Sequence, residues 1–329
     1  MSKINRRQFV QGVAAAAVLP SLASQANAQA AWPTKPVRLV VPFAAGGGTD
    51  AFARPLAKVL TGQLGQSFVI DNRGGGGGTI GADIAAKSPA DGYNFLVGAV
   101  HHTIAVSMYP KLGYDLQKDL VPVVLLSSVP NVIVVNPSKV PVKNYAEFLK
   151  FVKDRPGKLN YGSAGSGTAH HLIGELFKGA TGTHITHIPY RGAGPAMADL
   201  LAGQVDMIFD GLGTAAPQIK SGKLTAIAVT SEKRSYALPD VPSLTELGLK
   251  GFNAGTWYGI WAPANTPRPI ITKMHQEVVK ALATKELQDV WRTLGSEPGG
   301  MGPDEFAKMV NSEITKWAKV VKDSGAKID

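Results

Sequence analysis

The sequence predicts an α/β fold with two lobes, and three observations support this prediction. Short apolar runs alternate with helix-period patterns along almost the whole chain, as they do in α/β proteins. The 329 residues are 44% hydrophobic and 18% charged, a composition that suits about two domains with substantial cores. One glycine-rich turn lies in each half of the chain, at residues 42–50 and 161–168. We therefore expect each lobe to contain one of these turns.

The first half of the chain is expected to hold three strands, each an apolar run that ends at polar or glycine residues. The segments between them have apolar residues at helical spacing. The expected strands are 37–43, 68–71 and 93–100, and the expected helices are 49–64 and 80–87. Residues 121–135 hold two further apolar runs, which Ser127-Ser128-Val129-Pro130 separates.

The second half shows the same alternation. The expected strands are 159–162, 185–190, 205–209, 224–229 and 256–262, and the expected helices are 145–153, 168–178, 193–202 and 215–220. This order favours a sheet flanked by helices in each lobe.

The C-terminal tail is expected to be helical over residues 268–283, 285–294 and 303–324. Ile270, Met274 and Val278 fall at helical spacing and form an apolar stripe that needs a partner. Since no strand follows, we expect the tail to pack back on the first lobe.

The chain would then cross between the lobes twice, near residues 121–135 and near 253–261. Two crossings form a hinge. We expect lobe 1 to comprise residues 31–128 and 254–329, and lobe 2 to comprise residues 129–253.

Residues 1–30 predict a signal peptide of the twin-arginine type. Arg6 and Arg7 precede an Ala/Val/Leu stretch over 13–22, and small-residue cleavage sites follow at 26–28 and 28–30. The apolar stretch is too short to span a bilayer, and no later segment approaches the length of a membrane helix. The mature protein is therefore expected to be soluble and periplasmic.

The formal net charge of +10 favours anionic ligands at long range. Lys3, Arg6 and Arg7 of the leader contribute three of these charges, which leaves +7 in the mature chain. No long Lys/Arg run appears, so nucleic acid is not expected as a partner. Cysteine is absent, which excludes a disulfide framework and a thiolate metal site.

The two glycine-rich turns are the candidate binding elements. Each follows a strand and opens a helix, so each should present free backbone N–H groups and the positive end of a helix dipole. Such a turn binds anions, and two of them predict a clamp that closes on a carboxylate from both sides. Asp50 is expected to cap its helix or to accept a hydrogen bond from an amine or hydroxyl of the ligand. The turns are Phe43-Ala44-Ala45-Gly46-Gly47-Gly48-Thr49-Asp50 and Ser163-Ala164-Gly165-Ser166-Gly167-Thr168.

The first turn also fits a dinucleotide-binding pattern. Gly46-x-Gly48-x-x-Ala51 follows a strand, and Asp71 ends the next strand, where an acid would bind the ribose. Nicotinamide cofactors are scarce outside the cytoplasm, however, and Asp50 places a negative charge where a pyrophosphate would bind. The second glycine turn would also remain unexplained. We therefore expect no cofactor, and an exported oxidoreductase remains an alternative.

A hydrolase is the other enzymatic alternative, because Ser163 and Ser166 lie near His170. The segment lacks the first glycine of the G-x-S-x-G elbow, so a catalytic serine is not expected. The pairs His101-His102 and His170-His171 predict no metal site, because adjacent histidines on a helix diverge by about 100° and no His-Glu-x-x-His motif follows. We expect these histidines to bond a ligand carboxylate or to act as caps.

Two further charged residues, Arg191 and Asp210, lie at or just beyond strand ends in the second lobe. Arg191 is a candidate to bridge the ligand or the other lobe. Phe43, Tyr190, Trp257 and Tyr258 are candidates for apolar walls of the site or for the core.

Several stretches together carry a specific resemblance. In the first half they are VPFAAGGGTD at 41–50, VIDNRG at 69–74 and DGY at 91–93. In the second half they are YGSAGSGT at 161–168, HL at 171–172, GELF at 174–177, IPYRG at 188–192, DLLAG at 199–203 and VD at 205–206. Across nearly the whole mature chain, the sequence resembles the Bug-type receptors, which are the extracytoplasmic solute-binding proteins of tripartite tricarboxylate transporters.

The resemblance implies a two-lobed periplasmic binding protein fold, type II-like, with a deep cleft. It implies that the two glycine turns grip a carboxylated ligand, which is delivered to an integral-membrane permease. His101-His102-Thr103 also faces the cleft in such a fold, and these paired histidines depart from the Ser/Thr-rich sequence of many relatives. We expect a monomer that is not an enzyme. Tricarboxylates, dicarboxylates, acidic amino acids and aromatic acids all fit such a clamp.

Overall fold

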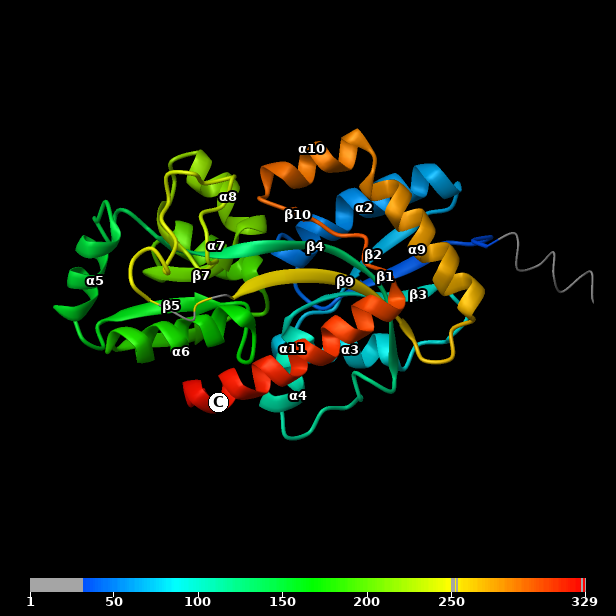
Figure 1. The fold of residues 1–329 in the computed structure, drawn as a ribbon, viewed down its shortest axis with the longest axis horizontal. Helices are drawn as coiled ribbons and strands as arrows, with labels where there is room; N and C mark the ends of the chain where they lie inside the picture. Colours follow the sequence, from blue (N-terminus) through cyan, green and yellow to red (C-terminus); the bar gives the residue numbers. More distant parts are fainter. Residues whose placement is uncertain (1–31, 250–251, 253, 327, 329) are drawn as a thin grey trace, which may run out of the picture.

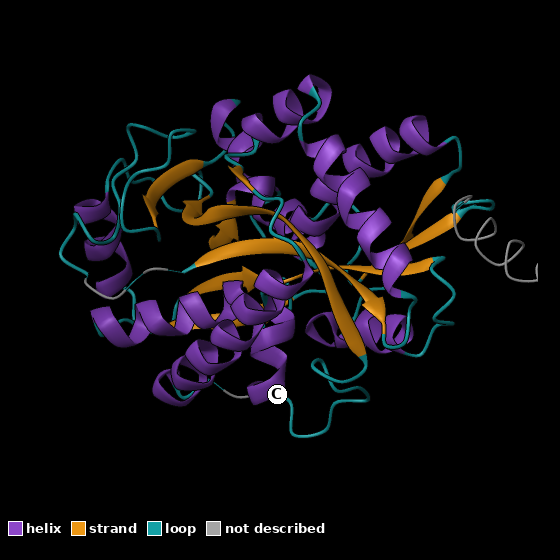
Figure 2. Ribbon diagram, turned by 45° about the vertical axis from the view of Figure 1, so that its right-hand side comes forward, coloured by secondary structure: helices purple, strands orange, loops and turns teal. Residues whose placement is uncertain are grey.

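The computed structural model describes residues 32–249, 252, 254–326 and 328, and the predicted signal peptide lies outside these residues (Figure 1). The fold is α/β, as predicted, with a curved sheet and helices on both of its faces (Figure 2). The main strand order is β2-β1-β3-β9-β4-β7-β5-β6, and β8 and β10 also pair with β4.

The first part of the sheet is parallel around β1. β1 pairs with β2 on one side and with β3 on the other. Its strands are β1 (Val37–Val41), β2 (Phe68–Asn72) and β3 (Asn94–Ala99), and its helices are α2 (Gly48–Leu64), η1 (Gly76–Gly78), α3 (Thr79–Ala86) and α4 (His101–Met108). The sequence did not predict α4. Six of its eight residues are buried, so it lacks the polar face that reveals an amphipathic helix.

Two long antiparallel strands, β4 (Leu120–Val135) and β9 (Gly255–Pro263), join the two parts of the sheet (Figure 1). β4 pairs with β9 along residues 120–130 and then with β7 and β8 along residues 131–135. The two apolar runs expected over 121–135 therefore belong to one strand. Its register shifts between Leu125 and Ser127, an irregularity of the kind that lets a strand bend.

The second part of the sheet is built around β7. β7 pairs antiparallel with β4 and parallel with β5, and β6 follows β5 at the edge. The strands are β5 (Leu159–Ser163), β6 (Ile185–Pro189), β7 (Met207–Gly211) and β8 (Thr225–Val229), and the helices are α5 (Tyr145–Lys153), α6 (Ala169–Thr181), α7 (Ala193–Leu201) and α8 (Leu212–Lys220).

The tail contains α9 (Arg268–Leu282), α10 (Lys285–Thr293), β10 (Glu297–Pro298) and α11 (Pro303–Ser324). α9 and α10 pack against α2, and the stripe residues Met274 and Val278 are fully buried. α11 packs against α4 and β4 of the first part, and it also contacts α6 of the second part. The tail was expected to pack on the first lobe alone, but α11 contacts both parts of the chain.

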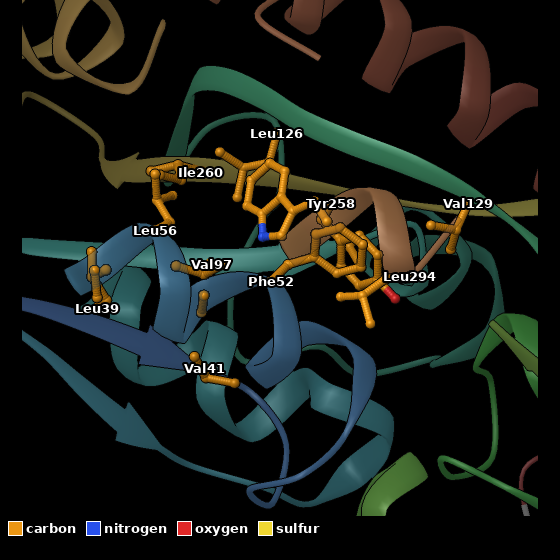
Figure 3. Packing of buried hydrophobic residues seen from close by; sticks show 14 of the residues in the cluster. Leu39, Val41, Phe52, Leu56, Val97, Leu126, Val129, Tyr258, Ile260 and Leu294 are labelled. Atoms are coloured by element: carbon orange, nitrogen blue, oxygen red, sulfur yellow. The ribbon is translucent and has the colours of Figure 1, made fainter. Parts of the chain in front are cut away.

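Each face of the sheet has its own hydrophobic cluster, and both clusters contain residues from both parts of the chain. In one cluster Phe52 stacks on Tyr258 with ring centroids 4.5 Å apart, close to Leu126 and Leu294 (Figure 3). Burial of each such side chain contributes about 1.5–3 kcal/mol to stability. Within the described residues, no helix combines the length and the apolar character needed to cross a bilayer.

Candidate functional site

A cavity of about 30 Å³ lies between the two parts of the sheet, and residues of both parts line it. Five of the described helices begin around it, namely α2, α4, α6, α7 and α8. The first turn of a helix has unpaired N–H groups and carries the positive end of the dipole, so this arrangement favours an anion. The lining residues are Phe43, Gly47, Gly48, Thr49, Ala99, Val100, His101, Ala164, Thr168, Ala169, His170, Ala193, Asp210, Thr214, Thr256 and Tyr258.

The first glycine turn brings the start of α2 to the cavity. Gly46 has φ +82°, a conformation that favours glycine, and Gly47 is extended as the N-cap of α2. A Cβ atom on Gly48 would collide with the hydroxyl of Tyr258. Glycine at this position therefore lets the backbone approach Tyr258, which lines the cavity.

Asp50 shapes this turn from within and does not line the cavity. Its carboxylate accepts hydrogen bonds from the backbone N–H of Gly46 at 3.0 Å, from Arg54 Nε at 2.7 Å and from Asn72 Nδ2 at 3.0 Å. Burial opposes ionisation, but the hydrogen bonds from Arg54, Gly46 and Asn72 outweigh it and lower the pKa of Asp50. Asp50 is therefore not the N-cap of α2, which is Gly47; it lies in the first turn of the helix and bonds back to the loop that precedes it.

The second glycine turn is held by its own side chains. Ser163 Oγ accepts from the N–H of Gly165 at 3.0 Å and lies 2.6 Å from His187 Nε2. Thr168 Oγ1 donates to the carbonyl of Gly165 at 2.7 Å. This network fixes the loop and brings the start of α6, at Ala169, to the cavity.

Ten of the candidate residues line the cavity. They are Phe43, Gly47, Gly48, Thr49, His101, Ala164, Thr168, His170, Asp210 and Tyr258. The candidates that do not line it are Ala44, Ala45, Gly46, Asp50, His102, Thr103, Ser163, Gly165, Ser166, Gly167, His171, Tyr190, Arg191 and Trp257. Ala193 and Thr214 line it without having been expected; each lies in the first turn of a helix that directly follows a strand and a glycine, Gly192 or Gly211.

Two hydrogen bonds join the two parts of the chain near the cavity. The N–H of Ala44 donates to the carbonyl of Arg191 at 3.2 Å, and the hydroxyl of Tyr109 donates to the carbonyl of Ser166 at 2.8 Å. Arg191 therefore bridges the two parts through its backbone. A volume of about 30 Å³ accommodates only one or two water molecules, so the structure is a closed arrangement.

Three residues that line the cavity each carry a buried polar atom without a hydrogen-bond partner in the structure. These atoms are His101 Nε2, His170 Nδ1 and Asp210 Oδ2. Burial raises the pKa of Asp210 to about 7 and lowers that of His170 to about 4. Burial, followed by the neighbouring His102 and His170, holds the pKa of His101 well below its ordinary value. Unpaired buried polar groups are costly, so the cavity is suited to a polar occupant.

His102 and Thr103 hold α4 in place. His102 Nδ1 lies 3.3 Å from the hydroxyl of Tyr114, and its ring meets the edge of Trp261. Thr103 Oγ1 donates to the carbonyl of Val100 at 2.7 Å. In the part of the chain that the structure describes, no three His, Cys, Asp or Glu side chains are grouped so as to hold a metal ion.

We expect acid to destabilise the protein between about pH 6.5 and pH 4. Burial lowers the pKa of His102 and His187 to about 3 and that of His170 to about 4. The unfolded chain protonates these residues near pH 6.5, so over this window it binds more protons than the native state, and stability falls as pH falls. Burial holds the pKa of His101 well below its ordinary value as well, so Asp210, which acts in the opposite direction, contributes one proton against four.

The melting temperature between pH 7.5 and 4.5 measures this effect. His102→Gln should make the pH profile shallower, because it removes one of the four histidine rings whose pKa burial lowers. A melting temperature that stays level down to pH 4.5 would contradict the assignment.

The chain matches known proteins along most of its length. The family model described as "Tripartite tricarboxylate transporter family receptor" matches residues 52–326. Protein BugT of Bordetella pertussis is 38% identical over 299 residues, which cover 90% of this chain and 91% of BugT.

Solved structures agree with this match. The periplasmic binding protein BugD aligns with a TM-score of 0.87 and 38% identity, covering 91% of this chain and 100% of BugD. R. palustris Rpa4515 with adipate aligns with a TM-score of 0.87 and 39% identity, covering 91% and 100% of the two chains. MatC from Rhodopseudomonas palustris with bound malate aligns with a TM-score of 0.84 and 35% identity. The alignment covers 88% of this chain and 100% of MatC.

These matches confirm the resemblance to Bug-type receptors and the two-lobed periplasmic binding protein fold. The position of the cavity, between the two parts of the sheet and among helix N-termini, is consistent with this fold. The chain therefore belongs to the tripartite tricarboxylate transporter receptor family and is a solute-binding receptor.

Proposed function

We propose that this receptor captures a small organic carboxylate between its two lobes in the periplasm and delivers it to the permease subunits of a tripartite transporter. The observation that supports this most strongly is the convergence of five helix N-termini on one cavity. The relatives with bound adipate and malate support the same ligand class. We infer that residues 1–30 direct export and that the mature receptor acts as a monomer.

The grip requires both glycine turns. Micromolar affinity needs about 8 kcal/mol of binding free energy. A charge-assisted hydrogen bond contributes about 1.5–3 kcal/mol, and a helix terminus adds about 0.3–1 kcal/mol. Four or five such bonds shared between the lobes are sufficient after the cost of lost ligand freedom and lobe closure. In this proposal the bonds come from the backbone around Gly47, Gly48 and Thr49 on one side and around Thr168 and Ala169 on the other.

The proposed lobes are residues 31–128 with 254–329, and residues 129–253. β4 and β9 are the two connections between them, and both run through the middle of the sheet. The 30 Å³ cavity is too small for a dicarboxylic acid, so the lobes must part to admit the ligand. Bending at β4 near Ser127 and at β9 near Gly255 supplies this motion in the proposal.

We further propose that the receptor catalyses no reaction. Ser163 and His187 make the contact that a hydrolase needs, but Ser163 is fully buried and does not line the cavity. Burial lowers the pKa of His187 to about 3, which leaves it a weak base. In a dinucleotide site, Asp71 would bind the ribose. Here its carboxylate is instead paired with Arg38 Nε at 2.7 Å and with Arg73.

A thermal-shift screen of organic acids tests the proposed function. A bound acid at a hundred times its Kd adds about 2.7 kcal/mol to the free energy of unfolding, which raises the melting temperature by about 5 °C. We expect such a shift with at least one mono-, di- or tricarboxylate, and full recovery of that acid by mass spectrometry. Consumption of the acid would favour an enzyme, and the absence of any shift across the acids would contradict the proposal.

A further inference from the structure

We propose that Asp210, together with His170 and His101, forms a second polar subsite that selects carboxylates carrying a hydrogen-bond donor, an ammonium or hydroxyl group, near the carboxylate. This inference rests on the proposed function. It concerns the part of the ligand that the helix N-termini do not bind.

The unpaired atoms of this subsite are almost completely buried. Asp210 is 1% exposed, His101 4% and His170 8%, and all three line the cavity. Asp210 Oδ2, His101 Nε2 and His170 Nδ1 have no hydrogen-bond partner in the structure. Buried polar atoms are normally paired, so three unpaired ones around one cavity indicate groups that a ligand completes.

Asp210 is held in a fixed orientation. Its Oδ1 accepts a hydrogen bond from the N–H of Gly211 at 2.9 Å and lies 3.4 Å from His170 Nε2. Because Oδ1 is engaged, Oδ2 is the oxygen left for the ligand, and the Thr214 side chain, which interacts with the Asp210 carboxyl, lies beside it. Around Asp210, α6 supplies His170, α4 supplies His101, α8 supplies Thr214 and β9 supplies Tyr258.

The charges around the cavity decide what Asp210 accepts. No described residue that lines the cavity is a lysine or an arginine. A second carboxylate of the ligand would therefore meet Asp210 without a side-chain cation between them. An ammonium or hydroxyl group would instead donate to Oδ2, and an ammonium would also replace the missing positive charge. Burial raises the pKa of Asp210 to about 7, and hydrogen bonds from Thr214 and from the N–H of Gly211 offset this rise only in part, as expected for a buried carboxyl that has no cationic partner.

Two sets of ligands separate this subsite from a simple carboxylate clamp. Succinate, L-malate and L-aspartate differ only in one substituent, as do adipate, 2-hydroxyadipate and 2-aminoadipate. Calorimetry with the wild-type receptor should give at least tenfold tighter binding of a substituted acid than of the unsubstituted acid in the set that fits. This comparison of ligands needs no variant, and its arms distinguish an ammonium from a hydroxyl.

Asp210→Asn tests the residue itself. Asparagine keeps an oxygen for Gly211 but presents an amide N–H₂ in place of Oδ2, so the preference for the substituted acid should fall below twofold. The matched control is Asp154→Asn, which removes an exposed carboxylate at the C-cap of α5 and should leave the preference unchanged. The melting temperature of each ligand-free variant shows whether it is folded.

Equal or tighter binding of the unsubstituted acid by the wild type overturns the inference, as does a preference that survives in a folded Asp210→Asn variant. In both cases carboxylates still bind and the proposed function stands. If no acid of either set and no acid of the thermal-shift screen binds, the proposed function fails, and this inference fails with it.

Discussion

Gly194→Ala is expected to weaken ligand binding at least a hundredfold while both lobes stay folded. Gly194 lies in the first turn of α7, and a Cβ atom there would be 2.6 Å from the carbonyl oxygen of Ala45 and 3.0 Å from the carbonyl carbon of Gly46 in the opposite lobe. Both are backbone atoms, so the collision is relieved only if the lobes move apart. Loss of two charge-assisted hydrogen bonds from one lobe costs about 3–6 kcal/mol, which corresponds to a hundredfold or more.

The fold itself should tolerate this change. Gly194 does not have the positive φ that requires glycine, and alanine stabilises a helix by about 0.5–1 kcal/mol relative to glycine. The melting temperature of the ligand-free protein should therefore stay level or rise. Gly62→Ala in α2 and Gly179→Ala in α6 are matched controls, because a Cβ at either position meets nothing within 4 Å. If calorimetry finds that the Kd of Gly194→Ala lies within threefold of the Kd of these controls, closure of the lobes is not required for ligand binding.

Gly47→Asp is expected to weaken binding about a thousandfold. Gly47 is the N-cap of α2, has φ −85° and lines the cavity. A carboxylate at this position would stand beside the ligand carboxylate. Two like charges about 4 Å apart repel by about 4 kcal/mol at the effective dielectric constant of a protein surface. The new side chain would also accept hydrogen bonds from the backbone N–H groups that would otherwise bind the ligand.

The controls for this variant separate charge from size. A Cβ on Gly47 would make ordinary contacts of 3.4–3.7 Å with Ala193 and Gly194, so Gly47→Ala should retain binding within a few-fold. Gly47→Asn has nearly the shape of the aspartate without its charge. Its ligand affinity should lie between the affinities of Gly47→Ala and Gly47→Asp. If Gly47→Asp binds the same acid as tightly as Gly47→Ala does, the first turn does not hold the ligand carboxylate.

The strand–turn–helix units could be predicted from the sequence because their signals are local. An apolar run, a glycine cluster and a helical pattern follow one another at β1–α2 and at β5–α6, and the structure contains both units. α4 carries no such signal, since its residues are buried on nearly all sides.

The lining of the cavity could be predicted only in part, because it depends on contacts between distant segments. Asp50 and Ser163 belong to the glycine turns, yet their side chains bond within those turns. Ala193 and Thr214 reach the cavity because β6 and β7 end beside β5, an order that the sequence does not reveal. Arg191 was expected for its charge, whereas its carbonyl makes the interlobe contact.

A crystal structure of the receptor with the acid that gives the largest thermal shift tests the central claim most directly. The account predicts that the carboxylate oxygens lie within about 3 Å of backbone nitrogens of both the Gly47–Thr49 segment and the Thr168–His170 segment. A carboxylate held by one of these segments alone, or bound outside the cavity that they enclose, would contradict it.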